Sequence, residues 1–274
     1  MKKLVLFFVP VVVIAVLSFR GIEQKNQIAK SVCDSLQISA QEHLTMAVLW
    51  YQRSAEMKAL YIQSYNMAKI SLENQIKKSS SGDKLAVVLD IDETVLDNSP
   101  YEAMMIEKGF SHSVKSWKEW TKLAIAKPLP GVIDFLLFVK SKGIEAFYVS
   151  NRETDEREAT LKNMINEKIP FADTSHIYLK GKESNKTARY NEINKKYKIV
   201  LTIGDNLRDF NEVFGNRKNN YGLNIVDSLK TQLRENFILL PNPMYGDWEK
   251  AIYGGKYPSE PEKNKLRKLA LKSY

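Results

Sequence analysis

Three short apolar runs in the sequence are each followed at once by polar side chains that could do chemistry. Asp90 and Asp92 follow the run LAVVL, Ser150 follows AFYV, and Asp205 and Asp209 follow IVLTI. If the runs are parallel strands of one sheet, their carboxyl ends meet at one edge, which is where open α/β sheets bind ligands. We therefore expect these five side chains to form one site.

The residue types at these positions suit phosphoryl transfer. Several carboxylates in one pocket repel one another and need a cation, and ligands that are all oxygen favour Mg²⁺ over zinc or copper. Lys186 lies between the second and third runs and would offset the charge of an incoming anion. Because an aspartate can itself attack phosphorus, the pattern predicts a Mg²⁺-dependent site with an aspartate nucleophile.

Each of these features has a more ordinary explanation when it is taken alone. An Asp-x-Asp pair or a Gly-Asp pair after a strand is usually a turn, Ser150 could cap a helix, and Lys186 could lie on a helix surface. Their consistent order after successive apolar runs favours the site.

The same runs predict the fold that would hold the site. Continuous apolar runs of this length are typical of strands buried on both faces, and here they alternate with segments of helical character. We expect strands at 85–89, 146–149, 177–179, 199–203 and 236–240, and helices at 43–77, 131–142, 154–168 and 184–197. The predicted fold class is α/β, a doubly wound parallel sheet preceded by N-terminal helices.

Two of the expected helices carry more detailed predictions. The range 43–77 has neither glycine nor proline, and it places apolar residues at helical spacing, namely Val48, Tyr51, Ala55, Ala59 and Ile62. For the helix at 154–168 we expect Thr154 as the N-cap, with Arg157 within reach of Glu153.

The range 98–127 interrupts the alternation directly after the first strand. It contains four large aromatic residues, Tyr101, Phe110, Trp117 and Trp120, and its C-terminal part has helical character. We interpret it as a small insertion that lies over the sheet as a cap.

Composition excludes several classes of protein. The 274 residues include 41 Lys and Arg against 32 Asp and Glu, a formal charge of +9, and 44% are hydrophobic, which excludes a disordered or collagen-like chain. The single cysteine, Cys33, excludes an intrachain disulfide framework and a cysteine-rich zinc site. No nucleic-acid-reading motif accompanies the positive charge, so no nucleic-acid polymer is expected as a partner.

The N-terminus has the pattern of a targeting segment. Two lysines precede the uncharged apolar range 4–19, and Arg20 ends it, which predicts a signal peptide or signal anchor over 1–20. A polar lead-in follows at 21–42, and a basic tail is expected at 256–274. We expect export to the periplasm, the cell envelope or the medium, with membrane attachment through the N-terminus as an alternative to cleavage. The sequence gives no indication of an oligomeric state.

Two long motifs carry a resemblance to a known family. VVLDIDETVLDNSPY (87–101) and IVLTIGDNLRDF (199–210) resemble the signatures of class C bacterial acid phosphatases, the outer-membrane lipoprotein nucleotidase family of the haloacid dehalogenase superfamily. The resemblance continues through FYVSNR, LKGKESNK and LPNPMYGDW. It implies a haloacid dehalogenase-like phosphatase domain over 43–255 with a small, mostly helical cap at about 98–127.

The resemblance also implies catalytic and metal-binding roles for individual residues. It makes Asp90 the nucleophile and Asp92 the general acid and base. Mg²⁺ would be held by Asp90, by the backbone carbonyl of Asp92, by Asp205 and by Asp209. Ser150, with the neighbouring Asn151, and a lysine would hold the phosphate; Lys186 fits the family spacing better than its competitor Lys182.

Two aromatic residues are implied in substrate recognition. Trp117 and Tyr245 match the positions between which the family stacks a nucleobase, although Trp117 could instead be a core residue of the insertion. The expected function is a Mg²⁺-dependent acid phosphatase that hydrolyses nucleoside monophosphates or other small phosphomonoesters through an aspartyl-phosphate. The alternative is a non-catalytic surface binder of nucleotides or another planar ligand, although such a binder has no need of Asp92.

One family feature is missing from the N-terminal segment. The lipoprotein members have a cysteine at the end of the apolar run, where lipid is attached. Here that position reads Ser18-Phe19-Arg20-Gly21, and Cys33 lies well beyond it. Lipid anchoring is therefore not expected.

Overall fold

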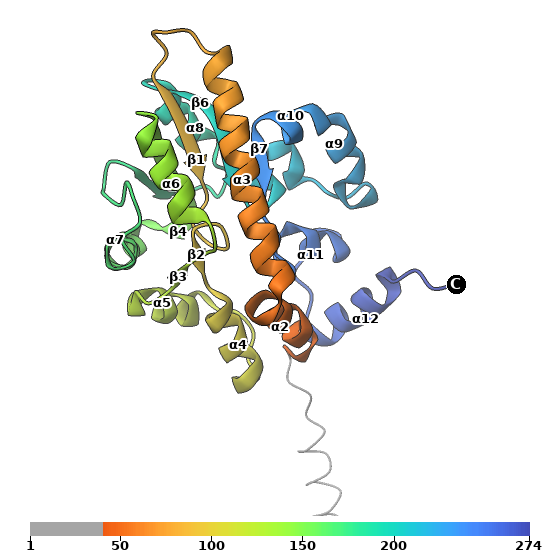
Figure 1. Cartoon of the computed structure of the whole chain (residues 1–274). Coiled ribbons are helices and arrows are strands. Elements are labelled where there is room, and N and C mark those ends of the chain that lie inside the picture. The colour runs from red at the N-terminus through yellow and green to blue at the C-terminus, as the bar shows by residue number, and fades with distance from the viewer. Residues whose placement is uncertain (1–40) are drawn as a thin grey trace, which may run out of the picture.

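A sheet of five parallel strands forms the centre of the protein. The computed structural model describes residues 41–274, so the predictions for residues 1–40 lie outside the described residues (Figure 1). The strand order is β5-β4-β1-β6-β7, and every neighbouring pair is parallel. The strands are β1 (Leu85–Leu89), β4 (Glu145–Glu153), β5 (Ile177–Lys180), β6 (Lys198–Gly204) and β7 (Phe237–Leu239). The predicted α/β fold with a parallel sheet is confirmed.

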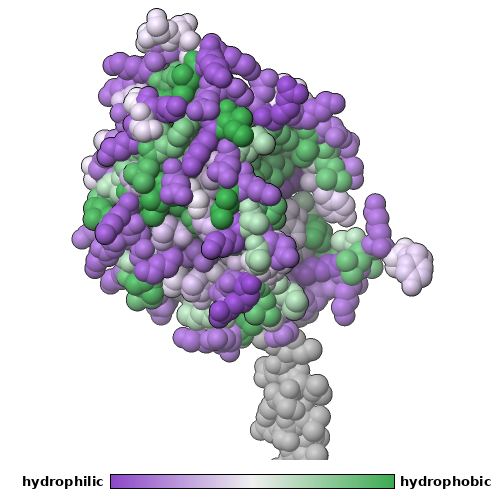
Figure 2. All heavy atoms as spheres, viewed as in Figure 1, coloured by the Kyte–Doolittle hydropathy of each residue, from purple (hydrophilic) through white to green (hydrophobic). Residues whose placement is uncertain are grey.

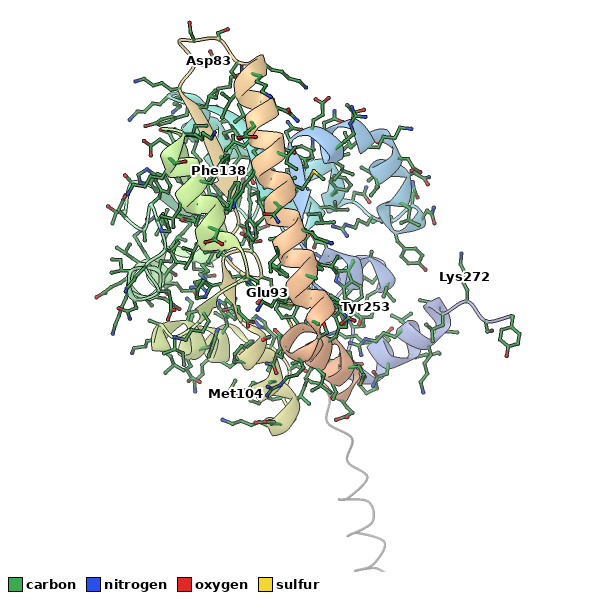
Figure 3. The ribbon with its side chains drawn as sticks, in the orientation of Figure 1. Asp83, Glu93, Met104, Phe138, Tyr253 and Lys272 are labelled. Carbon is green, nitrogen blue, oxygen red and sulfur yellow. The ribbon has the colours of Figure 1, made fainter. Side chains whose placement is uncertain are left out.

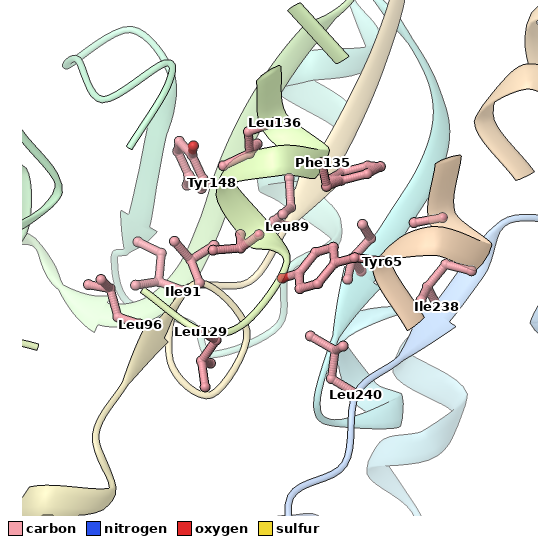
Figure 4. Close-up of a cluster of buried hydrophobic side chains, with 14 of the residues drawn as sticks. Tyr65, Leu89, Ile91, Leu96, Leu129, Phe135, Leu136, Tyr148, Ile238 and Leu240 are labelled. Atoms are coloured by element: carbon pink, nitrogen blue, oxygen red, sulfur yellow. The ribbon is translucent and has the colours of Figure 1, made fainter. Parts of the chain in front are cut away.

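Helices cover both faces of the sheet. On one face, α3 (Ala55–Lys78) and α6 (Val132–Ser141) pack over Val87 and Leu89, and Figure 4 shows part of this core around Tyr65, Phe135 and Tyr148. On the other face, α8 (Thr187–Asn194) packs Ile193 against Ala86 and Val88. The alternating residues of β1 therefore enter two separate cores, which explains why this strand is apolar throughout. Five further helices lie later in the chain, namely α7 (Arg157–Asn166), α9 (Leu223–Ser228), α10 (Lys230–Glu235), α11 (Asp247–Ile252) and α12 (Glu260–Ala270).

The single helix predicted over 43–77 is wrong, because the helix breaks at Ser54. A short 3-10 turn (Glu42–Leu44) leads into α2 (Thr45–Arg53), and α3 begins directly after the break. Ser54 has an extended backbone, with ψ 141°, and its hydroxyl accepts a hydrogen bond from the N–H of Met57. Serine is a favourable N-cap, so it starts a new helix here instead of continuing the first.

The break also changes which residues are buried. Val48 and Tyr51 of α2 are buried as the helical spacing predicts. Three residues that the same spacing placed with them are exposed, namely Ala55, Ala59 and Ile62. Because the chain restarts at Ser54 in a new phase, α3 instead buries Met57, Tyr61, Tyr65, Ala68 and Leu72.

The helix predicted at 154–168 also begins differently. Its first residues form a 3-10 turn (Thr154–Glu156), and Glu153, not Thr154, is the N-cap. The carboxylate of Glu156 accepts from the N–H of Glu153 at 2.7 Å and completes a capping box. Arg157 does not pair with Glu153, because its guanidinium donates to the carbonyl of Ile177 at 2.8 Å.

The small helical insertion expected after the first strand is confirmed. It consists of α4 (Ser99–Lys108) and α5 (Val114–Leu123). Its two ends are joined by a short antiparallel pair, β2 (Leu96–Asp97) and β3 (Lys127–Pro128). We call α4, α5 and the loop between them the cap.

Two further features of the surface complete the fold. The range 256–274 contains α12, which is tied to α11 by a 2.9 Å contact between Arg267 and Glu249. On the face shown in Figure 2, hydrophobic side chains lie among hydrophilic ones, and Met67 and Ile70 of α3 are among the exposed apolar residues. Within residues 41–274, no helix combines the length and the apolar character needed to span a bilayer.

Two tyrosines of α3 hold the loop that follows β1. The hydroxyl of Tyr61 donates to the carbonyl of Glu93 at 2.6 Å, and that of Tyr65 donates to the carbonyl of Thr94 at 2.7 Å. Both rings are fully buried. Since a buried carbonyl without a donor is costly, the two hydroxyls fix the backbone immediately after Asp90 and Asp92.

We expect Tyr65→Phe to lower the free energy of unfolding by about 1–3 kcal/mol, because it leaves the carbonyl of Thr94 buried and unpaired. Urea denaturation of both proteins would measure the loss. Tyr221→Phe is the matched control, since Tyr221 is 48% exposed and should change stability little. Equal stability of Tyr65→Phe and the parent chain would show that this bond does not support the loop.

Candidate active site

The register of the sheet brings the ends of β1 and β6 together. Leu89 pairs with Ile203, so Asp90 lies opposite Gly204 and next to Asp205. The N–H of Asp90 donates to the carbonyl of Ile203 at 3.0 Å. On the other side of β1, Leu89 pairs with Tyr148, which brings Ser150 of β4 to the same edge.

Three aspartates meet at this edge. Asp90, Asp205 and Asp209 each offer one carboxylate oxygen, and the three oxygens lie within 4.8 Å of one another. Asp209 ends the 3-10 turn Leu207–Asp209, and its carboxylate accepts from the N–H of Asn206 at 3.1 Å. These three predicted metal ligands are therefore brought together.

Gly204 allows Asp209 to approach the strand. A β-carbon on Gly204 would lie 2.5 Å from Oδ2 of Asp209 and 2.7 Å from its Cβ. Those distances are far below normal contact, so any side chain at position 204 would displace the aspartate. The glycine of the Gly-Asp pair has a steric role in the site that is independent of turn formation.

Lys186 is the lysine that reaches the carboxylates. Its Nζ lies 2.5 Å from Oδ1 of Asp90 and 2.7 Å from Oδ1 of Asp209. The lysine side chain is only 4% exposed, whereas the competing Lys182 lies on the exposed loop before α8. The geometry therefore favours Lys186 over Lys182 as the cation of the site.

Burial and charge shift the pKa values of these groups. Burial, together with the charges of Asp209 and Asp92, raises the pKa of Asp90 to about 7 despite the opposing effect of Lys186. Burial and the charges of Asp209 and Asp90 also raise the pKa of Asp205. For Lys186, the aspartate charges outweigh the effect of burial and raise its pKa, so it stays protonated.

These shifts show that one lysine does not balance the carboxylates. A divalent cation that binds oxygen would bring Asp90 and Asp205 back to their ionised forms, and the all-carboxylate donor set suits such an ion. The residues present therefore fit a hard divalent metal.

Asp92 lies beside the aspartate cluster in a separate set of hydrogen bonds. Its carboxylate accepts from the guanidinium of Arg152 at 2.7 and 3.0 Å and from Nδ2 of Asn98 at 2.9 Å. The hydroxyl of Ser150 is 3.4 Å away. Arg152 of β4 and Asn98, directly before the cap, thus fix the orientation of Asp92. The hydroxyl of Ser150 faces the same carboxylate.

Sequence reasoning assigned no role to Arg152 or Asn98. Both lie inside the quoted motifs, Arg152 two residues after Ser150 and Asn98 within VLDNSPY. Side chains alternate along a strand, so position 152 shares a face with position 150. This alternation could have identified Arg152 as a site residue from the sequence. Nothing in the sequence indicated that Asn98 would also accept a 2.8 Å hydrogen bond from Trp120.

Asn151 occupies a different environment from its neighbour Ser150. Its side chain is exposed, and its Oδ1 accepts from Arg189 at 2.8 Å. Arg189 also donates to the carbonyl of Ser150 at 2.5 Å and to the carbonyl of Asn185 at 3.2 Å. Arg189, which the sequence did not single out, links the Ser150 segment to the loop that carries Lys186.

A cavity of about 640 Å³ opens onto these residues. Asp90, Asp92 and Asp205 line it together with Trp117 from the cap and Tyr245 from the segment after β7. The ring of Trp117 meets Tyr101 edge-on, with centroids 5.3 Å apart, and lies 5.7 Å from the guanidinium carbon of Arg152. Trp117 is half-buried, so one wall of the cavity is aromatic and lies close to Arg152.

Fold and site together define a phosphatase of the haloacid dehalogenase superfamily. The model of the family described as HAD superfamily, subfamily IIIB (acid phosphatase), matches residues 17–248, and the chain belongs to this family. The chain is similar to the class C acid phosphatase from Bacillus anthracis, with 42% identity, a TM-score of 0.81 and coverage of 86% of this chain and 100% of that one. It is also similar to that enzyme with tungstate bound, with 43% identity, a TM-score of 0.81 and coverage of 85% and 98%.

The comparisons confirm the family resemblance found in the sequence. The chain is an enzyme, a hydrolase of small phosphomonoesters, and the alternative of a non-catalytic binder is set aside. Phosphatases of this superfamily generally use a divalent metal, and the cluster of Asp90, Asp205 and Asp209 can bind one.

We expect the metal-free protein to lose stability as the pH rises from about 5 to 8. Unfolded Asp90 releases its proton near 3.8, whereas folded Asp90 keeps it to about 7. The folded state therefore binds more protons in this window, so the free energy of unfolding falls with rising pH, by about 1–4 kcal/mol. Carboxyls with lowered pKa, such as Asp83 and Asp173, are ionised in both states here and contribute little.

Thermal unfolding in EDTA at several pH values would measure this slope. Mg²⁺ should restore stability most at pH 8, because it binds the ionised cluster of the folded state. Asp90→Asn should make the slope shallower, while the raised pKa of Glu102 keeps part of it. A metal-free protein that is as stable at pH 8 as at pH 5 would contradict the charge assignment.

Proposed function

We propose that the protein is a Mg²⁺-dependent acid phosphatase that hydrolyses nucleoside monophosphates through an aspartyl-phosphate on Asp90. The observation that carries the proposal is the position of Asp90, which contacts Lys186, clusters with Asp205 and Asp209, and lines the same cavity as Asp92. A carboxylate at the centre of such a site is placed to attack phosphorus, and the neighbouring cation offsets the charge of the incoming phosphate.

In this proposal Asp90, Asp205 and Asp209 hold the metal, as their shared oxygen cluster allows. When bound, Mg²⁺ supplies positive charge that stabilises the transferring phosphoryl group. Lys186 contributes a second positive charge, since its raised pKa keeps it protonated across the working range. The hydroxyl of Ser150, already turned toward Asp92, can donate to a phosphoryl oxygen.

The first half-reaction transfers the phosphoryl group to the protein. An oxygen of Asp90 forms a bond to phosphorus while the bond from phosphorus to the leaving oxygen breaks. Protonated Asp92 gives its proton to that leaving oxygen, so the alcohol departs neutral. Arg152 and Asn98 hold Asp92 in position for the transfer.

The second half-reaction returns the enzyme to its starting state. Asp92, now ionised, takes a proton from water as the water oxygen attacks phosphorus. The bond between phosphorus and Asp90 breaks, inorganic phosphate leaves, and Asp92 is again protonated. One group therefore serves as acid and then as base, which requires that it stay beside the position opposite Asp90, where the leaving oxygen departs and the water then attacks.

The preference for nucleotides rests on Trp117 and Tyr245. Both line the cavity that holds Asp90, and Trp117 presents a half-buried ring from the cap. Stacking of a base on an aromatic ring contributes about 1–3 kcal/mol. The related enzyme from Bacillus anthracis has been solved with tungstate, a tetrahedral oxyanion like phosphate, which supports an oxyanion end in this cavity.

Export from the cytoplasm is a further part of the proposal. It is supported by the two N-terminal lysines, the apolar range 4–19 and the arginine that ends it. The absence of a cysteine at the end of that range supports export without a lipid anchor. The substrate would then be an extracytoplasmic phosphomonoester.

We expect Asp92→Asn to lose far more activity on alkyl phosphates than on aryl phosphates, by about 10²-fold or more in kcat, because an aryl leaving group needs little protonation. Steady-state kinetics with a nucleoside monophosphate and a nitrophenyl phosphate would measure the difference. Asp90→Asn is the control and should be inactive on both. Equal losses on both substrates for Asp92→Asn would remove its role as general acid.

We expect Trp117→Ala and Tyr245→Ala to raise KM for nucleoside monophosphates by about 5- to 100-fold, since each removes one stacking face. KM for a small ester without a base should change much less, because the loss concerns substrate binding and not the chemical step. Parallel losses on both substrates would mean that the rings support only the fold, and the nucleotide preference would have to be abandoned.

A further inference from the structure

The cavity continues beyond the catalytic residues into a polar compartment. Its walls come from the cap, from α11 and from α12, and the side chains that line it include Glu102, Met105, Glu249, Lys263 and Arg267. The hydroxyl of Ser111 in the cap donates to Glu260 of α12 at 3.3 Å, which links the two walls. We call this region the distal compartment; Figure 3 labels Tyr253, which directly follows α11.

Most acidic groups of the distal compartment have protein partners. Glu249 accepts from the hydroxyl of Tyr253 at 2.5 Å and from Arg267 at 2.9 Å. Glu260 forms an ion pair with Lys263 at 2.8 Å. These contacts explain why α12 lies against α11, although Oε2 of Glu260 is buried without a hydrogen-bond partner.

Glu102 is different from these two acids. It lies in α4, is only 5% exposed, and lines the cavity. Within residues 41–274 no side chain or backbone N–H donates a hydrogen bond to its carboxylate. Burial, followed by the charge of Glu249, raises its pKa to about 8. Below that pH the group is a neutral acid, which can both accept and donate a hydrogen bond.

A buried carboxyl without a partner is costly to keep. Burial disfavours the ionised form of Glu102, as its raised pKa shows, and replacement by an apolar side chain of similar shape can be neutral or stabilising. A methionine has almost the same length and would fill the same space. The presence of an acid at this buried position is therefore explained by a partner that enters the cavity.

We propose that Glu102 hydrogen-bonds a polar group, an amino or a hydroxyl, at the end of the substrate remote from the phosphate. This inference rests on the proposed nucleotide specificity. With the phosphate at Asp90 and the base against Trp117 and Tyr245, the groups left to meet Glu102 are the exocyclic amino group of the base or a ribose hydroxyl. Glu102 is thus a specificity-determining residue that does not take part in the chemical step.

The test compares substrates that differ by one polar group. Adenosine 5'-monophosphate is measured against purine riboside 5'-monophosphate, which lacks the amino group, and against 2',3'-dideoxyadenosine 5'-monophosphate, which lacks both ribose hydroxyls. In Glu102→Met, the advantage of adenosine 5'-monophosphate in kcat/KM over one of these two analogues should fall about tenfold relative to the parent enzyme. The analogue that shows the fall identifies whether the amino group or the hydroxyl is bound. Glu102→Gln, which still donates and accepts, should keep most of the advantage.

Two further measurements separate this role from a structural one. Glu107→Gln is the matched control, because Glu107 lies in the same helix but is exposed. Glu102→Met should also raise the melting temperature. An acid that is retained at a buried position for substrate binding lowers stability, and the substitution removes it. A lower melting temperature together with unchanged substrate ratios would overturn the inference.

The outcomes also separate this inference from the proposed function. If the parent enzyme turns over nucleotides no better than a nitrophenyl phosphate, the nucleotide preference fails and this inference fails with it. If the preference for nucleotides persists while both substrate ratios are the same in Glu102→Met and the parent enzyme, only the role of Glu102 is refuted.

Discussion

The repulsion between three clustered carboxylates is the constraint that organises this structure. Asp90, Asp205 and Asp209 bring their oxygens within 4.8 Å of one another, where burial and mutual charge raise the pKa values of Asp90 and Asp205. The fold meets this constraint with Lys186, which contacts two of the three carboxylates from the start of α8. The negative charge that remains favours binding of a hard divalent cation, and that cation together with Lys186 would then attract an anionic substrate.

The rest of the protein keeps these charges from moving apart. Two buried tyrosines of α3 donate to the carbonyls of Glu93 and Thr94, so the helix that precedes β1 fixes the loop that follows it. Glu93 adopts a left-handed backbone with φ 53°, and its carboxylate accepts from the N–H of Asn98 at 2.7 Å. The tight loop and the packed helix thus act on the same few backbone atoms, which limits how far the aspartates can separate.

The sequence was informative where a residue's position along a strand decides its role. Asp90 and Asp205 follow apolar runs, and the parallel sheet necessarily brings such positions to one edge. The sequence was not informative where the structure around a residue depends on packing against distant parts of the chain. The break at Ser54 depends on a cap that competes with helix continuation, and the apolar spacing across it misplaced Ala55 and Ile62. The environment of Glu102 likewise depends on α11 and α12, which lie more than a hundred residues away in the sequence and have no local signal in α4.

The short pairing of β2 with β3 has a consequence for how the enzyme can diversify. Because Leu96 lies beside Pro128, the chain enters and leaves the cap at adjacent points of the same ribbon. The cap is therefore a module with a common entry and exit, and a different insertion could be accommodated there without a change in strand order. Asn98 sets the boundary of that module, since it bonds Asp92 and must be retained. Substrate range can thus evolve in the residues after Asn98 while the phosphate chemistry stays encoded in the sheet.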